Sequence, residues 1–244
     1  MGLIGAFISG VGSVLSAAAS AFCSGVSSVC SAIGGALFSG VGGVASIVTG
    51  IVGTAVGIPQ ILSIVGAVGS IVSGIAQWLG MKQPEEKPEE LGMKAEESER
   101  KPEEFDSTEA YISYLRKEVE IDQMKVKSLS NEDRARYAAI GTGLYIKGIE
   151  EKYDIEAPGE FWRTVADLHM KGDEVRKYIE AFKEKGIGSM KDMSDYIKGK
   201  PLESGTEPRE VSGAIMDGLK EIYPEISDKE LMEKFTSLTM PSAE

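Results

Sequence analysis

The first 81 residues of this chain contain no Asp, Glu, Lys, Arg or His, and Lys82 is the first charged side chain. A segment of this length without charge can become ordered only where its apolar side chains leave water, in a bilayer or in an assembly of helices. The remainder carries the whole formal charge of -12, from 38 acidic and 26 basic side chains. The sequence therefore predicts two regions of different physical character, 1–81 and 82–244.

A fifteen-residue repeat runs through the uncharged region, where SGVGSVLSA at 9–17 returns as SGVSSVCSA at 24–32 and as SGVGGVASI at 39–47. Its bulky residues recur at intervals of three and four, which is typical of one helix face and not of strand alternation. We expect this face to contact lipid or a second layer of helices. The predicted membrane-facing residues are Phe7, Val11, Val14, Phe22, Val26, Val29, Ile33, Leu37, Val41, Val44 and Val48.

One position further along, the same spacing selects only Gly and Ser. Small residues at every third or fourth position let helix backbones approach closely, so this face predicts glycine-zipper-like packing in a homo-oligomer. The period of about 3.75 residues per turn exceeds 3.6 and predicts a right-handed supercoil. The predicted helix-packing residues are Gly12, Ser16, Ser20, Ser24, Ser27, Ser31, Gly35, Ser39, Gly42, Ser46 and Gly50.

Pro59 interrupts this pattern, and Ile61–Leu79 predicts a second apolar helix of nearly membrane-spanning length. Trp78 precedes the first cation and is predicted to anchor that helix at the membrane interface. An unbroken helix over 3–57 would be about 80 Å long, so the segment either folds back as a hairpin or extends beyond one bilayer. Two alternatives remain open, a Gly/Ser-rich chain that never orders and a repetitive β-solenoid.

Beyond the uncharged region, PEE occurs three times in 82–104, which predicts a disordered, solvated acidic linker. From residue 105, apolar residues recur at three- and four-residue spacing in short stretches separated by Gly and Pro. Asp106-Ser-Thr-Glu109 and Ser227-Asp-Lys-Glu230 have the form of capped helix starts. We expect an all-α chain whose residues 105–244 form an acidic bundle of six or seven short helices.

The charged region offers no recognisable catalytic or ligand motif, and we expect no enzyme activity and no cofactor. Gly141-Thr-Gly143 lacks the lysine of a phosphate-binding loop. With His169 as the single histidine, and Cys23 and Cys30 both in the uncharged region, no metal site is expected. His169 is expected in the core or at its boundary and not as a catalytic base, and the acidic balance makes direct nucleic-acid binding a poor fit.

The stretch GLIGAFISG at residues 2–10 resembles the fusion peptides of enveloped viruses, and the Gly/Ser/Ala-rich opening resembles small-phage pilot and DNA-ejection proteins. The resemblance covers the N-terminal third and implies a virion or membrane-penetrating structural protein that assembles a conduit for genome delivery. Its partners would be a lipid bilayer, further copies of the chain and, through residues 105–244, other structural proteins. Its location would be a membrane or a virion, without a cleavable signal peptide.

Two other functions are compatible with the same pattern. A secreted pore-forming effector or toxin would use residues 1–80 as an inserting hairpin. A membrane-anchored scaffold would use them as an anchor and present its helical domain to a partner.

Overall fold

A computed structural model describes residues 47, 50–52 and 57–239 of the chain. These residues form ten α-helices and one 3-10 helix, with no strand among them, which confirms the all-α prediction. The elements are α3 (Ile58–Trp78), α4 (Pro88–Glu97), η1 (Pro102–Glu104), α5 (Thr108–Glu118), α6 (Gln123–Lys127), α7 (Asn131–Tyr153), α8 (Gly159–Asp167), α9 (Gly172–Glu184), α10 (Lys191–Ile197), α11 (Pro208–Ile222) and α12 (Asp228–Thr239).

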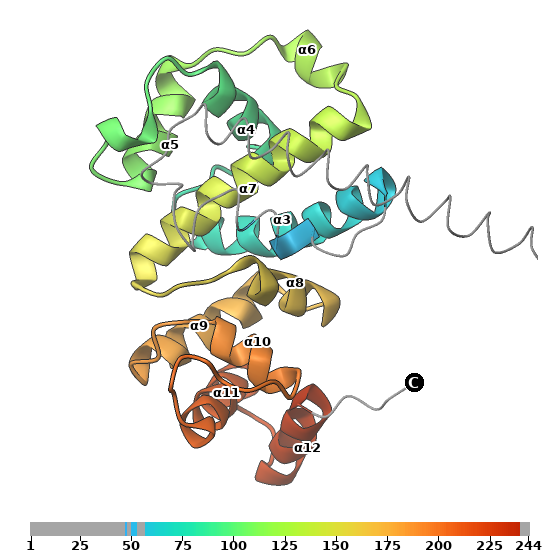
Figure 1. Ribbon diagram of the computed structural model, residues 1–244, viewed down its shortest axis with the longest axis vertical. Coiled ribbons are helices and arrows are strands. Elements are labelled where there is room, and N and C mark those ends of the chain that lie inside the picture. Colours follow the sequence, from blue (N-terminus) through green and yellow to red (C-terminus); the bar gives the residue numbers. More distant parts are fainter. Residues whose placement is uncertain (1–46, 48–49, 53–56, 240–244) are drawn as a thin grey trace, which may run out of the picture.

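The helices are stacked along the long axis of the molecule around α7 and α3 (Figure 1). Helix α7 packs most extensively against α4 on one side and α3 on the other, with α5 also in contact. Helix α3 in turn touches α8 and α9, and α9 packs on α11, which carries α10 and α12. The apolar helix α3 is therefore an internal layer that joins the two ends of the molecule.

The helix ends follow local sequence signals. Ser107 and Ser130 cap α5 and α7, their hydroxyls accepting hydrogen bonds from backbone N–H groups three residues on. At Ser227 the predicted capping box is present, because Glu230 accepts from the Ser227 N–H at 2.9 Å and Ser227 Oγ accepts from the Glu230 N–H. Gly186 and Gly199 follow the ends of α9 and α10 in the left-handed conformation that favours glycine. The predicted box at 227–230 is present, whereas α5 starts one residue later than the predicted box at 106–109 and is capped by Ser107 instead of Asp106.

The prediction of a disordered, solvated linker over residues 82–104 is wrong, because this segment contains the packed helix α4. Proline begins helix α4 at Pro88, where its missing N–H has no helical partner to lose. Leu91, Met93 and Ala95 are fully or almost fully buried. Gly92 lies against Gly141 of α7, so close that a Cβ on Gly92 would overlap the Tyr137 carbonyl oxygen. A few apolar side chains and one glycine are enough to pack this acidic segment onto α7.

Residues 105–239 contain eight α-helices, α5 to α12, where six or seven were expected. The Gly- and Pro-containing separators between the apolar stretches, at 157–159, 172, 186–188, 199–201 and 223–224, coincide with helix boundaries. One core of contacting apolar side chains extends from Ile47 to Leu231 and includes α3. Among the described residues, the change in composition at residue 81 is therefore not a structural boundary.

Candidate functional site

Residues 47 and 50–52 of the uncharged region pack against helix α8 through a close contact between two glycines. Ile47, Ile51 and Val52 are at most 2 % exposed. Gly50 lies against Gly159, the first residue of α8, at a distance where a Cβ on Gly50 would be 2.9 Å from the Gly159 Cα. These contacts hold the described residues 47 and 50–52 against α8.

Helix α3 makes a second contact of the same kind with α9. Gly74 lies beside Gly172, the first residue of α9, and a Cβ on Gly172 would be 2.6 Å from the Ile71 carbonyl oxygen. The two segments that make these contacts have similar sequences, because IVTGIV at 47–52 recurs as IVSGIA at 71–76. This short repeat, paired with glycines that begin α8 and α9, is the sequence signal from which both contacts could have been found.

Helix α3 has two different faces. Its buried face packs into the core through Val65, Val68 and Val72. The opposite face is exposed and consists of small or uncharged residues, namely Ser63, Gly66, Ala67, Ser70, Gly74 and Gln77. Within the described part of the chain, α3 is the one helix long and apolar enough to cross a membrane, a test that the core helix of a soluble protein also passes.

Trp78 stands at the C-terminal end of α3 and is 61 % exposed. The Arg176 guanidinium lies 4.1 Å from the centre of its indole ring, and Arg176 also pairs with Glu180 at 2.5 Å. Trp78, Arg176, Asp173 and Gly172 border a hollow of about 240 Å³. Trp78 therefore presents an accessible ring beside a cation at one edge of the body, and its role as a membrane anchor stays a prediction.

Most of the other candidate residues predicted from the sequence precede the described part of the chain. All eleven predicted membrane-facing residues, and ten of the eleven predicted helix-packing residues, fall outside the described residues. The exception is Gly50, whose contact with Gly159 is within one chain. Its packing in an oligomer stays a prediction.

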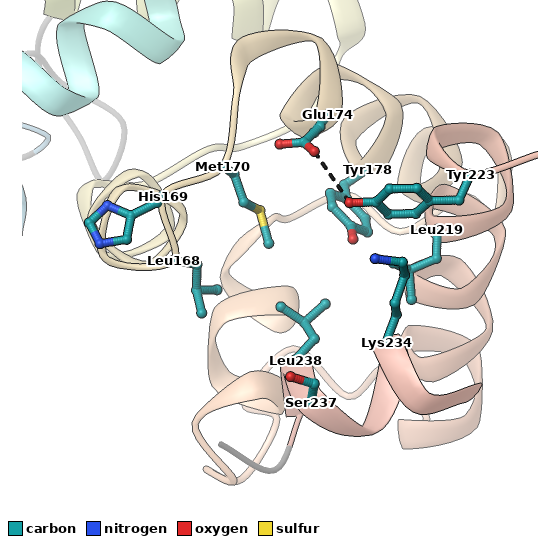
Figure 2. A pocket seen from close by; sticks show the side chains of 10 residues that line it. All are labelled: Leu168, His169, Met170, Glu174, Tyr178, Leu219, Tyr223, Lys234, Ser237 and Leu238. Carbon is teal, nitrogen blue, oxygen red and sulfur yellow. Dashed lines mark hydrogen bonds between the residues drawn. The ribbon is translucent and has the colours of Figure 1, made fainter. Parts of the chain in front are cut away.

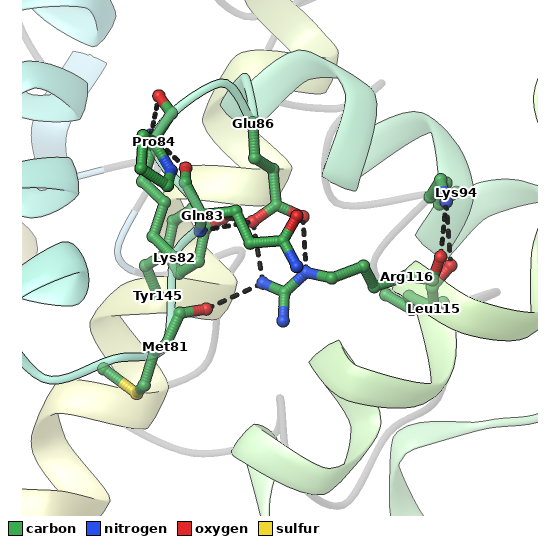
Figure 3. Close-up of polar contacts among 9 residues, drawn as sticks. All are labelled: Met81, Lys82, Gln83, Pro84, Glu86, Lys94, Leu115, Arg116 and Tyr145. Atoms are coloured by element: carbon green, nitrogen blue, oxygen red, sulfur yellow. Dashed lines mark hydrogen bonds and ion pairs between the residues drawn. The ribbon is translucent and has the colours of Figure 1, made fainter.

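Figure 3 shows the strongest polar cluster of the charged region, which ties 81–86 to α5 and α7. Glu86 accepts hydrogen bonds from Arg116 Nε at 3.1 Å and Nη2 at 2.7 Å, and from the Tyr145 hydroxyl at 2.6 Å. Arg116 Nη2 also donates to the Met81 carbonyl oxygen at 2.8 Å. Burial acts to raise the pKa of the Glu86 carboxyl, but these hydrogen bonds outweigh it and the pKa is lowered.

Perturbed carboxyl groups can mark active sites, but this cluster is satisfied by its own partners. A second buried carboxyl, Glu150, accepts from Lys147 at 2.7 Å and from the Ala157 N–H at 2.8 Å, and burial raises its pKa. Both groups hold helices and loops together. Over residues 57–239 and the described positions before them, no cluster of His, Cys, Asp or Glu could hold a metal ion.

His169 is exposed, so the prediction that it lies in the core or at its boundary is wrong. It follows the end of α8 with a φ of 54°.

Comparison of the chain with known proteins finds no matching protein family, no matching curated protein and no matching solved structure.

Proposed function

We propose that this chain is a non-enzymatic, membrane-penetrating structural protein of the virion type. In this proposal the uncharged segment before residue 47 inserts into a bilayer and self-associates through its Gly/Ser face. The helical body, residues 47–239, holds that segment and stays outside the membrane. The observation that carries the proposal has two parts: the segment and α3 form one stretch of sequence without charge, and α3 has an exposed face of small residues.

The length of the segment suits this role. A bilayer crossing needs about 20 apolar residues, so residues 1–46 are long enough for two crossings as a hairpin. A helix of Gly, Ser and Val is poor in water, because each interior glycine costs about 1 kcal/mol relative to alanine. Lipid or neighbouring helices would supply the missing stabilisation.

The face of α3 that is left open by the body supports self-association. Ser63, Gly66, Ala67 and Ser70 are exposed and carry no charge. Among the described residues, no atom lies within 4 Å of a Cβ built on Gly66, so another helix can approach there. Small faces on both α3 and the segment would pack closely in an oligomer.

The test is flotation with lipid vesicles combined with release of dyes of graded size. The full chain is compared with a chain beginning at Ile47, which keeps the residues that bury against α8. A chain beginning at Lys82 is an unsuitable control, because removing α3 would expose the apolar faces of α7, α8 and α9. The expected result is flotation and release with a size cut-off by the full chain and neither by the shortened chain.

A triple variant tests the packing face: Gly12→Leu, Gly35→Leu and Gly42→Leu should abolish assembly and dye release. Gly50 is left unchanged because its contact with Gly159 belongs to the fold. The matched control places leucine on the other face, as Val26→Leu, Val29→Leu and Val41→Leu, and should still assemble. An unchanged oligomer in the glycine variant would refute the zipper.

The other outcomes separate the two alternative functions. Flotation without release would indicate a membrane-anchored scaffold. Permeabilisation by externally added protein, without a ring or tube of defined size in electron micrographs, would indicate a pore-forming effector. A full chain that neither floats nor releases dye would overturn the membrane proposal.

A further inference from the structure

A hollow of about 390 Å³ opens between the α8–α9 loop, α9, α11 and α12, at the end of the body formed by the C-terminal helices (Figure 2). Its volume is within the range of small-molecule sites. Four apolar side chains form its walls: Leu168, Met170, Leu219 and Leu238. The membrane proposal uses none of the residues that line it, so a ligand in this hollow is independent of that proposal.

The Tyr178 side chain brings a buried donor into this hollow. Tyr178 is only 3 % exposed, and among the described residues none hydrogen-bonds its hydroxyl, which Figure 2 shows pointing into the hollow. The ring is buried while the hydroxyl borders the hollow, so a polar atom of a ligand there can accept a hydrogen bond from it. Burial raises the pKa of this phenol, which keeps its proton available for donation.

The position of this hydroxyl is fixed by packing against α11. A Cβ on Gly218 would lie 2.5 Å from Cδ1 of Tyr178, so the ring rests directly on the helix backbone. The donor is therefore preorganised and needs no rearrangement to meet a ligand.

Lys234 supplies a positive charge in the same space. Its Nζ lies 4.0 Å from the centre of the Tyr223 ring, and it forms no ion pair with any described residue. Glu174, the carboxylate of the hollow, already accepts from the Tyr223 hydroxyl at 3.5 Å and from the Lys171 N–H at 2.7 Å. Among the described residues, Lys234 is the cation of the hollow without an ion pair, and the side chains of Tyr178, Ser237 and His169, which also line it, have no hydrogen-bond partner.

We propose that this hollow binds a small amphiphilic carboxylate, with the carboxylate accepting from Tyr178 and Lys234 and the aliphatic part against the four apolar side chains. Charge complementarity selects the anion, since the Lys234 ammonium has no ion pair among the described residues and charge-assisted hydrogen bonds are stronger than neutral ones. The ligand class is a medium-chain carboxylate of the fatty-acid type.

The experiment is calorimetric titration of the full chain with octanoate, 1-octanol and octylamine, which share a tail and differ in head group. We expect octanoate to bind with one site per chain, and at least about tenfold more tightly than the other two. Tyr178→Phe and Lys234→Met should each weaken octanoate binding about tenfold. Neither variant removes an apolar contact, since phenylalanine keeps the ring and methionine keeps an aliphatic side chain.

Lys229→Met is the matched control, because Lys229 lies on the same helix, outside the hollow, with 88 % of its side chain exposed. It should bind octanoate like the unchanged chain. Thermal unfolding checks each fold, and Tyr178→Phe should be no less stable because its hydroxyl has no partner among described residues. Equal affinity for octanoate and octanol, or octanoate binding unaffected by both hollow variants, would overturn the proposal. So would the absence of octanoate binding.

Discussion

Three glycine pairs set the distances between neighbouring helices in the described part of the chain. Gly92 and Gly141 bring α4 onto α7, while the other two pairs join α8 and α9 to Gly50 and Gly74. In each pair a side chain would meet backbone atoms, which cannot move as the end of a flexible side chain can. The helices are therefore closer than larger residues would allow.

Gly141→Ala should strongly destabilise the fold, because its Cβ would overlap the Pro88 carbonyl oxygen. Overpacking of this kind costs about 1–3 kcal/mol or more. The matched change is Gly66→Ala on the exposed face of α3, where nothing lies within 4 Å and alanine should stabilise by up to about 1 kcal/mol. Thermal unfolding followed by circular dichroism measures both, and equal effects would show that α4 does not lie against α7 at Gly141.

The two buried carboxyl groups should give opposite pH dependences. The lowered pKa of Glu86 means that the unfolded chain binds its proton more readily, so Glu86 stabilises above its unfolded pKa and this contribution is lost as pH falls through its folded pKa. The raised pKa of Glu150 has the opposite sign, so its contribution falls as pH rises.

Glu86→Gln should therefore reduce the gain in unfolding free energy between about pH 3 and pH 6, and Glu150→Gln should increase it. Urea unfolding at several pH values measures the slopes. Loss of the Glu86 contacts should cost about 1–3 kcal/mol at neutral pH, since it leaves the partly buried Arg116 without its carboxylate. Parallel slopes in the two variants would contradict the assignment.

At the scale of elements, α4 shows how a few side chains decide whether an acidic segment folds. Glutamate and proline dominate 82–104 and indicated a solvated linker. Met93 is completely buried, whereas Met124 in α6 is 78 % exposed. The two methionines make a matched pair that tests the packing of α4.

Met93→Ala should lower the unfolding free energy by about 2–5 kcal/mol, as expected for a buried methionine. Met124→Ala should change it by no more than about 0.5 kcal/mol. Urea unfolding of both variants measures the difference. If 82–104 were a solvated linker, the two changes would have equally small effects.

The sequence predicted the elements with one-sided apolar stripes and clear caps, and it missed those without them. Helix α7 shows no stripe because it is buried on nearly all sides, including Gly141, Thr142 and Gly143. The placement of α3 also escaped prediction, because an apolar stretch free of charge suits a bilayer and a protein core equally well. Only its neighbours decide between the two.

The candidate sites were predictable to different degrees for the same reason. The Gly/Ser face is inferred from spacing along one expected helix, and it stays a prediction. The carboxylate hollow joins Tyr178, Leu219 and Leu238 from three helices, and the spacing of each residue indicates only a core position. Their common cavity depends on how those helices cross, which spacing within one helix does not determine.

At the scale of the whole molecule, the uncharged and the charged residues occupy different parts of the chain. The formal charge of -12 comes entirely from residues beyond 81, while residues 1–46 have none. A body of this charge is repelled by anionic headgroups, and the repulsion acts over the Debye length. Binding of the uncharged segment to anionic membranes should therefore become stronger as the salt concentration rises.

We expect the full chain to float with neutral phosphatidylcholine vesicles to the same extent at low and physiological salt. With vesicles containing phosphatidylserine, flotation should be weaker at low salt and should rise with salt, as screening shortens from about 30 Å at 0.01 M to about 8 Å at 0.15 M. A chain beginning at Ile47 controls for binding by the body and should not float. Flotation on anionic vesicles that instead falls with salt would identify a basic surface as the membrane contact, because screening lowers flotation only where the body is attracted to the lipid. Insertion of the uncharged segment would then no longer be needed to explain binding.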